Sequence, residues 1–419
     1  EVDGTARVSG ATVSVTTLDR TASYRHGLSY LLINADAVEG QFADLLIGSD
    51  FINSRLVYGL EDVTLRLSTN GARSFAEAAL TSNQWETASA LDLLDQNAGS
   101  DSLSLYNAVL FSSDAEARIA FDQLSGEEHA SAGAVLLSQS RSLGEGVFAR
   151  LHEGRTGAWV KAMGSRTQLD GDGNAAGVDA SGTGLMFGAD GPAGDDGRVG
   201  FVAGVGNGSI DADRGVGSID VDSYHLGLHG ASQMGQLSLK AGLAYSRNQL
   251  ETSREVALDG FADQLDATYD ADLTQVYAEA SYALAPRNGI SLSPYAGLTH
   301  AILSTDAFTE TGGAAALSSE AATEEATFAT VGLRASGDLG QDETRDLGWT
   351  VSASLQHAFG DQAADRRMSL ADGGAFLVSG APIGRNTAAL AVGLNMAVGE
   401  TGELGVGYHG QVSGDMSTS

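Results

Sequence analysis

Apolar and polar side chains alternate with a period of two along the second half of the chain. In residues 237–246 one face carries apolar and aromatic residues, which are Leu237, Leu239, Ala241, Leu243 and Tyr245. The same alternation recurs in 274–284, 327–336, 349–356 and 390–398. Because successive side chains of a strand point to opposite faces, this pattern predicts a series of strands that each have one apolar face.

The predicted strands are long, and their polar face is unusual. We count about eleven segments between residues 157 and 413, of roughly 10 to 16 residues each, whereas strands of soluble sheets usually have about 5 or 6. A soluble sheet that buries its apolar face alternates in the same way. Here, however, the polar face is rich in Gly and Ser and carries isolated charges at Lys161, Lys240, Glu279 and Arg334. These features favour an all-β fold, a transmembrane antiparallel β-barrel of about 12 strands around a narrow, wet lumen.

An odd number of strands is unexpected in such a barrel, because bacterial single-chain barrels have even numbers. The sequence ends at Ser419, where a twelfth strand would begin. We therefore expect that a final strand of about ten residues is missing, since an open edge in lipid leaves costly unpaired backbone groups. Short and long connections alternate between the segments, which predicts periplasmic turns and longer extracellular loops.

A long helical segment precedes the strands. Residues 124–151 contain no Pro and space their apolar residues as a helix does, and Ser125 with Glu128 predicts a capping box at its start. About 28 residues at about 1.5 Å each make a rod of about 42 Å, close to the thickness of a membrane with its headgroups. The charged residues of this segment exclude contact with lipid. We therefore expect the helix to thread the barrel lumen; the alternative is a surface helix that joins two domains.

Inside the lumen, the helix would face the polar side of the strands, and its small residues would allow a close fit. The predicted lumen and linker contacts are Arg141, Glu145, Arg150, Lys161, Lys240, Glu279 and Arg334. Among these, Arg141 and Arg150 are expected to pair with lumenal acids such as Glu279. Five aromatic residues are predicted to lie at the membrane interfaces, namely Trp159, Tyr245, Tyr282, Trp349 and Tyr408.

The first part of the chain has a different character. Residues 1 to about 70 read as short strands with apolar runs, as in the last coils and cap of a β-solenoid, with a small free-standing sandwich as the alternative. From Ser74 to Gly126 the composition shifts towards short amphipathic helices. The expected organisation is residues 1–100 as a β-solenoid end, 101–154 as a linker with the threading helix, and 155–419 as the barrel.

Composition narrows the class of protein. The chain has 54 acidic and 23 basic residues and a net charge of −31, which disfavours nucleic acid and anionic surfaces as partners. Cys is absent, so a disulfide framework, a thiolate metal site and a cysteine nucleophile are excluded. The many Gly and few Pro residues fit a β-rich protein outside the cytoplasm. The sequence starts at Glu1 without Met, which we interpret as a processed or shortened chain.

Candidate metal sites are weak. Asp170, Asp172 and Asn174 have part of a calcium-loop spacing, but Ser181 occupies the position of the required Glu, so a solvated acidic loop is the preferred interpretation. His225 and His229 share one strand face, where packing in or near the lumen is preferred over a metal pair. We predict no metal, no cofactor and no catalytic residue in this sequence.

Several stretches together resemble the C-terminal part of a monomeric autotransporter of type V secretion. LYNAVL and AEARIAFDQLSGEEHASAGAVLLSQSR resemble the linker of this family, and GAWVKAMGS, SPYAGLTH and VGYHGQVSG resemble its first, middle and penultimate barrel strands. YRHGLSYLLINADAVEGQFADL and LVYGLEDVTLRL resemble the end of the passenger and its autochaperone region. The sequence departs from the family in lacking the last strand with its terminal aromatic residue, and the Asn-Asn pair that some members cleave.

The resemblance implies a bacterial outer-membrane translocator, preceded by the end of a right-handed β-helix passenger on the cell surface. It implies that the protein exports, anchors and helps to fold its own N-terminal passenger. The implied partners are outer-membrane lipid and lipopolysaccharide, and the barrel-assembly machinery with periplasmic chaperones during biogenesis; the chain is expected to be a monomer. Any catalytic passenger would lie upstream of Glu1. The alternatives are a surface adhesin or a porin-like channel.

Overall fold

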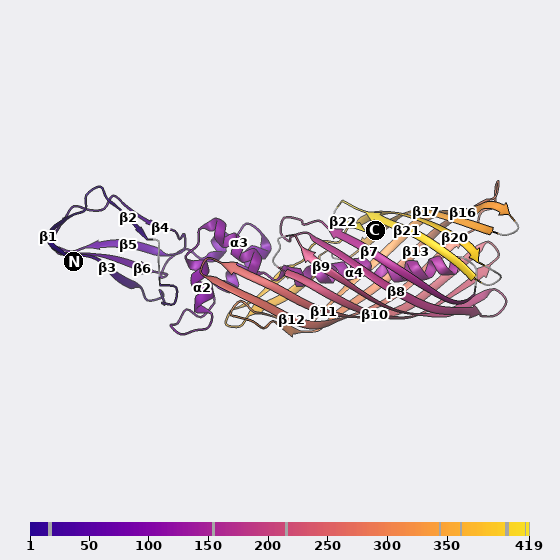
Figure 1. Cartoon of the computed structure of the whole chain (residues 1–419), viewed down its shortest axis with the longest axis horizontal. Coiled ribbons are helices and arrows are strands. Elements are labelled where there is room, and N and C mark those ends of the chain that lie inside the picture. Colours follow the sequence, from indigo (N-terminus) through magenta and orange to yellow (C-terminus); the bar gives the residue numbers. More distant parts are fainter. Residues whose placement is uncertain are drawn as a thin grey trace.

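The computed structural model describes residues 1–15, 19–152, 156–213, 217–342, 345–360, 363–398, 402–414 and 416–418. Three parts follow one another along the long axis of the molecule (Figure 1): a small sheet structure with the N-terminus, a group of short helices, and a long barrel with a helix inside. The expected start of the barrel at residue 155 lies outside the described residues. The first described barrel strand begins at Gly157.

The N-terminal part has six strands: β1 (Val2–Arg7), β2 (Thr12–Val15), β3 (Leu28–Glu39), β4 (Asp44–Ile47), β5 (Asn53–Tyr58) and β6 (Asp62–Ser68). β1 pairs with β3 and β2 pairs with β4, in both cases in parallel. Ala6 faces Val38 and Val13 faces Leu45, so in both ladders the chain returns beside itself after 32 residues. β6 then adds antiparallel pairs with β3 and with β5.

Short helices follow, as the composition predicted: η1 (Phe75–Ala78), α1 (Ser82–Leu91), α2 (Leu103–Leu110) and α3 (Asp114–Leu124). They pack around a shared apolar core that includes Phe75, Leu91, Val109 and Phe121. α3 starts with a capping box, in which the Glu116 N–H donates to the Ser113 hydroxyl and the Ser113 N–H donates to the Glu116 carboxylate.

The long helix is α4 (Glu127–His152), and its existence and position confirm the helix predicted over 124–151. The predicted capping box is wrong. Ser125 is the C-cap of α3, and its hydroxyl accepts from the Glu127 N–H at 3.3 Å. Gly126, with a φ of +67°, makes the turn between the two helices. None of the helices among the described residues has the length and apolarity needed to cross a membrane.

The barrel closes with twelve antiparallel strands. They are β7 (Gly157–Leu169), β8 (Val178–Pro192), β9 (Gly197–Ala212), β10 (Gly217–Met234), β11 (Leu237–Leu258), β12 (Phe261–Tyr282), β13 (Ile290–Thr305), β16 (Ala322–Asp342), β17 (Arg345–Phe359), β20 (Asn386–Val398), β21 (Gly402–Val412) and β22 (Met416–Thr418). The eleven predicted segments are confirmed as strands. β22 occupies the twelfth place and pairs on one side with β21 and on the other with β7.

The apolar face of the strands points outward, as the alternation predicted. Leu243, Val276 and Leu355 are 53%, 57% and 65% exposed on the outer surface. Their neighbours along the strands, such as Ala244 and Gln275, are buried inside. This distribution is that of a sheet whose apolar side contacts lipid and whose other side encloses a filled lumen.

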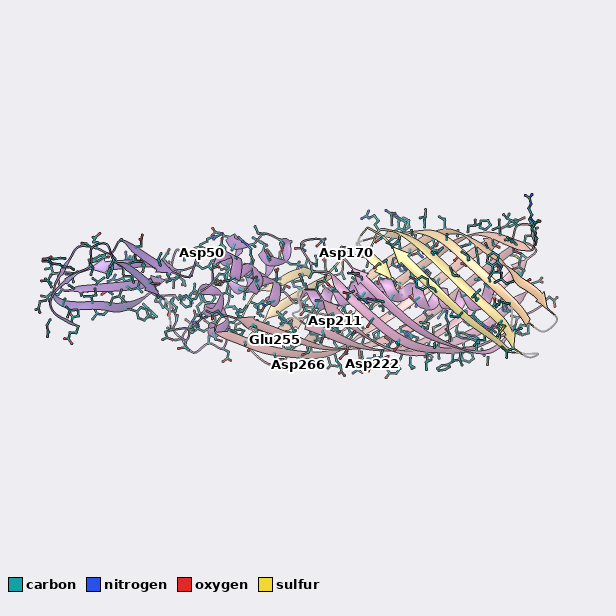
Figure 2. The ribbon with its side chains drawn as sticks, turned by 45° about the horizontal axis from the view of Figure 1, so that its top comes forward. Asp50, Asp170, Asp211, Asp222, Glu255 and Asp266 are labelled. Atoms are coloured by element: carbon teal, nitrogen blue, oxygen red, sulfur yellow. The ribbon has the colours of Figure 1, made fainter. Side chains whose placement is uncertain are left out.

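The alternation inverts beyond Tyr245, along the part of β11 that pairs with β10 up to Arg254 and then extends past it together with β12. On this extension the outward residues are polar, and Figure 2 marks Glu255 and Asp266 along it. The inward residues are now apolar, and Leu250 and Val256 are fully buried. A wall with polar outer residues and an apolar inner core belongs in water, so the membrane region ends near Tyr245.

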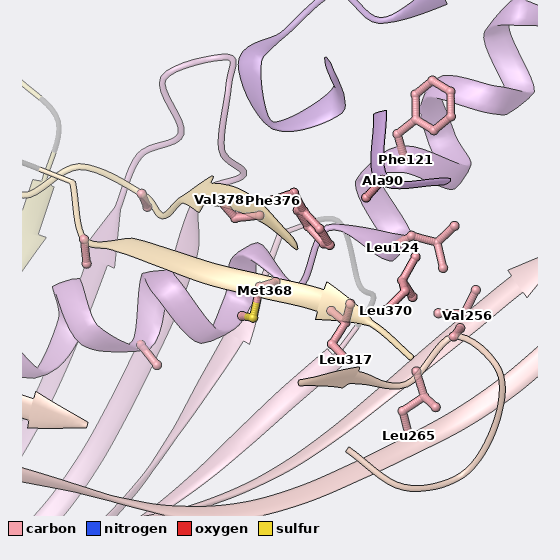
Figure 3. Packing of buried hydrophobic residues seen from close by; sticks show 14 of the residues in the cluster. Ala90, Phe121, Leu124, Val256, Leu265, Leu317, Met368, Leu370, Phe376 and Val378 are labelled. Atoms are coloured by element: carbon pink, nitrogen blue, oxygen red, sulfur yellow. The ribbon is translucent and has the colours of Figure 1, made fainter. Parts of the chain in front are cut away.

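Two of the predicted extracellular loops contain a second sheet that the sequence did not indicate. It consists of β14 (Phe308–Thr309), β15 (Leu317–Ser319), β18 (Asp365–Leu370) and β19 (Ala375–Ser379), and we call it the lid. Leu317, Met368 and Phe376 of the lid belong to the same buried core as Leu124 of α3 and Val256 of the barrel wall (Figure 3). The lid therefore joins the helical part to the mouth of the barrel.

Candidate functional site: the occupied lumen

α4 lies inside the barrel (Figure 1), and 20 of its 26 residues are buried. Burial on all sides distinguishes it from a surface helix that joins two domains, so the threading prediction is confirmed. The residues that approach the wall most closely are small. A Cβ on Gly146 would lie 3.0 Å from the Met186 methyl group, and one on Gly133 would lie 2.9 Å from the Glu324 carboxylate. A side chain at either position would require the flexible end of Glu324 or Met186 to move.

The periplasmic half of α4 packs through an apolar cluster. Leu143, Val147, Phe148 and Leu151 of the helix contact wall residues, which are Met186, Val202, Ala244 and Tyr277. This is a small core inside a lumen that is otherwise lined by polar and small residues. It holds the lower half of the helix by burial rather than by charge.

The extracellular end of α4 presents three consecutive ionisable residues. Glu127, Glu128 and His129 are 3%, 4% and 1% exposed. Glu127 accepts from the Asn83 side chain of α1 and from the Ala176 N–H, both at 3.0 Å. Two carboxylates in the first turn also interact favourably with the positive end of the helix dipole.

His129 and Glu128 connect this turn to the barrel wall and the lid. The two ring nitrogens of His129 lie 3.0 Å from the Tyr269 hydroxyl and 3.0 Å from the Glu310 carboxylate. Glu128 lies 3.4 Å from the Arg254 guanidinium of β11. Arg254 is 1% exposed, contacts both Glu310 oxygens at 3.0 and 2.5 Å, and donates to the Gln123 and Ala315 carbonyls.

Glu310 is therefore the charged centre of this end of the lumen. Burial by itself raises the pKa of its carboxyl, but the charge of Arg254 and the contacts with His129 lower the pKa to about 2. Its second oxygen also accepts from the Leu317 N–H at 2.8 Å. The carboxylate thus binds the wall, the helix and the lid at once.

The three predicted contact residues in the C-terminal half of α4, which are Arg141, Glu145 and Arg150, all contact side chains of the barrel wall. Arg141 donates to the side chains of Gln356 and Gln411 and lies over the Phe328 ring. Glu145 contacts Gln356 and His409. Arg150 pairs with Asp190 at 3.3 Å.

Arg150 thus pairs with a lumenal acid as expected, but Glu279, the acid named as an example, has other partners. Glu279 pairs within the wall, at 3.0 Å from the Lys240 ammonium and at 3.1 and 3.0 Å from the Arg334 guanidinium. Lys240 faces Glu279 directly in the β11–β12 register, and Arg334 reaches Glu279 from β16, which is separated from β12 by β13. Lys161 also points into the lumen, where its ammonium lies 3.6 Å from the position of a Cβ on Gly146.

Four of the five predicted interface aromatics lie on the outer surface. Tyr245, Tyr282 and Tyr408 are 40%, 47% and 60% exposed, and Trp349 is on the outward side of β17 next to Gly337. Trp159 is the exception. It points inward, against Gly188, and packs on the apolar cluster of α4, so its prediction as a membrane anchor is wrong.

The weak metal candidates have other contacts. Asp172 accepts from the N–H groups of Asn174 and Ala175, and the Asn174 side chain exchanges hydrogen bonds with Asn83 of α1. His225 lies 2.7 Å from the Ser246 hydroxyl inside the lumen. His229 is buried there as well.

Sequence reasoning missed the cluster at the extracellular mouth. Arg254 and Glu310 lie in segments predicted as extracellular loops and Tyr269 in a predicted barrel strand, but none of the three was predicted as a site residue. A signal was present in the helix itself, because three successive ionisable residues at 127–129 need buried partners if the helix threads a lumen.

Comparison with known proteins places these features in a family. The autotransporter β-domain family matches residues 158–409. An extracellular serine protease of Serratia marcescens is 29% identical over 438 residues, which cover 91% of this chain and 41% of that protein. A second extracellular serine protease of the same organism is 31% identical over 332 residues, or 74% of this chain and 31% of the relative. The chain thus spans less than half the length of these relatives.

Solved structures show the same fold. The translocator domain of the autotransporter NalP from Neisseria meningitidis matches 69% of this chain and 94% of its own, with a TM-score of 0.55 and 19% identity. The transport unit of the autotransporter AIDA-I from Escherichia coli matches 70% of this chain and 96% of its own, with a TM-score of 0.51 and 17% identity.

Proposed function

This chain belongs to the autotransporter β-domain family and is an outer-membrane translocator, and from this premise we propose that α4 is the last part of the exported chain, retained in the lumen as plug and tether. The single observation that carries the proposal is the path of the backbone. The sheet structure and short helices lie at the end of the barrel that bears the lid, and α4 runs from there through the lumen to the start of β7 (Figure 1).

This path fits a chain that has been exported through the barrel. The described residues N-terminal to Glu127 lie at the extracellular end, whereas the C-terminal end of α4 and the first residues of β7 lie at the opposite end. One crossing of the lumen is therefore enough to join the secreted part to the membrane part. The glycines of α4 lie close to side chains of the wall, and the apolar cluster packs around the C-terminal half of the helix. Both features support a plug that closes the pore.

We also propose that residues 1–100 are the last coil and cap of a β-helix passenger and promote its folding. The return of the chain after 32 residues in two parallel ladders supports a solenoid coil. The antiparallel strands β5 and β6 then terminate the stack, as a cap does. A stable last coil would give the exported chain a surface on which earlier coils fold, which biases export outward.

The translocator domain itself is non-catalytic. The relatives from Serratia marcescens are extracellular serine proteases, so we propose that any protease activity of the whole protein belongs to sequence upstream of Glu1. Lipopolysaccharide and outer-membrane lipid as surroundings, the barrel-assembly machinery and periplasmic chaperones as partners, and a monomeric state are further proposals that follow from the family.

Deletion of residues 127–152 tests the plug and tether. We expect the variant to lose surface display of the N-terminal part and to form large, steady conductances in planar bilayers, while its folded barrel keeps heat-modifiable gel mobility. Unchanged display together with unchanged conductance would refute the proposal. A porin-like channel, the alternative function, predicts steady conductance with α4 in place.

A further inference from the structure

Export through the barrel has to stop at one residue of the linker. The structure contains a site that can determine which residue this is. Glu127, Glu128 and His129 enter a site built from Asn83, Ala176, Arg254, Tyr269 and Glu310, which we call the first-turn site. The members of this site come from α1, the β7–β8 connection, β11, β12 and the segment between β14 and β15.

The rest of the helix offers no second segment that fits. Between Glu128 and Arg141 the only ionisable residue is His129, and the intervening side chains are small, apolar or neutral. Such a stretch has no charged group that would fix it at one depth in the lumen. If α4 stopped one turn further in or out, Leu124 and Ser125 or Ala132 and Gly133 would take the places of Glu128 and His129 opposite Arg254 and Glu310.

A shift would also leave the buried carboxylates of Glu127 and Glu128 without their partners, although Arg254 and Glu310 would still pair with each other. Arg254 and Glu310 are 1% and 3% exposed, and Glu127 and Glu128 are nearly as buried in the observed register. A buried carboxylate that loses its partner is neither hydrated nor paired, so such a register is strongly disfavoured. The backbone supports the same register, since the Ala381 N–H donates to the Ser131 hydroxyl at 2.9 Å.

We propose that the first-turn site determines where export stops, by binding Glu127, Glu128 and His129 as they leave the lumen. This inference rests on the proposed plug and tether role of α4. Binding closes the lid over the same three residues, because Glu310 contacts His129, Arg254 and the lid strand β15 together. The site therefore acts after the passenger has crossed the membrane.

A disulfide reports the register of α4. A Cβ on Gly133 would lie 3.5 Å from the Ala364 Cβ, within the range of bridged cysteines, and the chain has no other Cys. In the Gly133→Cys/Ala364→Cys background, we compare the added pair Glu128→Ala/His129→Ala with the control Gln139→Ala. Gln139 makes one side-chain contact in the lumen, to Thr167 at 3.4 Å.

The parent and the control are expected to form the disulfide to the same extent. The Glu128→Ala/His129→Ala variant is expected to display the N-terminal part normally but to form the disulfide at least threefold less, with raised conductance. An equal disulfide yield would overturn the proposal. Loss of display in the Glu128→Ala/His129→Ala variant, with its barrel folded, would also overturn the proposal, since the site acts after export. Absent display in the double-cysteine parent would instead count against the plug and tether role.

An insertion provides a second test that leaves every contact residue in place. Four Ala residues between Ala134 and Val135 lengthen α4 by about one turn. If the first-turn site sets the stop, the disulfide between positions 133 and 364 still forms, because the extra turn is accommodated on the periplasmic side. Loss of this disulfide in the insertion variant, with the barrel folded, would show that the periplasmic end sets the stop and would overturn the proposal.

Discussion

The ring of Tyr277 lies against Gly144 of α4, where a Cβ would be only 3.1 Å from the ring. On its other side the same ring covers Gly242, where a Cβ would be 2.6 Å away. Gly144 of the helix and Gly242 of the wall both lack a side chain, and the ring of the wall residue Tyr277 contacts both. The distance between α4 and this part of the barrel is set by the thickness of that ring.

Gly144 therefore tests how tightly the plug fits. Gly144→Ala is expected to cost little, because the gain in helix propensity, about 1 kcal/mol, offsets a contact that is short by a few tenths of an ångström. Gly144→Leu cannot be accommodated without moving Tyr277 or the helix, and overpacking of this kind costs about 1–3 kcal/mol. Urea unfolding of the purified barrel in detergent measures the free energy of unfolding of both variants. Equal stability of the two would contradict the tight fit.

Glu279 is predicted to stabilise the wall through two cations at once. Glu279→Gln leaves the nearly buried Lys240 and the partly buried Arg334 without a countercharge, which is expected to cost about 3–5 kcal/mol. Asp270→Asn is the matched control, because it removes an exposed pair with Arg247 on the outer face and should cost less than about 1 kcal/mol. Urea midpoints that fall equally in both variants would refute this difference.

The first-turn site is expected to lose stability in acid. The pKa of Glu310 is lowered from its ordinary value of 4.5 to about 2, so its contribution to stability is complete above pH 4.5 and is lost as the pH falls towards 2. The shift corresponds to a contribution on the order of 3 kcal/mol. Protease resistance of the lid should fall between pH 4.5 and 2, and in the Glu310→Gln variant that fall should be smaller. An identical decline in both proteins would exclude Glu310 as its cause.

The two barrel tryptophans should report opposite surroundings. Trp349 lies on the outer face, and Trp159 packs inside against α4. In liposomes with brominated acyl chains, a variant that retains only Trp349 should be quenched strongly and one that retains only Trp159 weakly. Equal quenching of the two would place Trp159 on the outer surface of the barrel, at the membrane interface that the sequence predicts.

The inward position of Trp159 could have been predicted from the sequence. Trp159 and Lys161 are two residues apart in one strand, so they must share a face. Assigning Lys161 to the lumen and Trp159 to the lipid was therefore inconsistent. The general preference of Trp for membrane interfaces was allowed to override the local alternation.

The sequence by itself determined the strands, their two faces and the threading helix, because each depends on neighbours along the chain. Alternation places Leu243 outside and Lys240 inside whatever the strand pairs with, and the small and charged residues of α4 exclude lipid in any fold. Only the tertiary structure decided that Glu279 binds Lys240 and Arg334 rather than the arginines of α4, and that Arg254 and Glu310 meet Glu128 and His129 beneath a lid. Those contacts depend on strand register around a closed barrel and on the folding of distant loops, and those of Glu128 and His129 bring together residues more than a hundred positions apart.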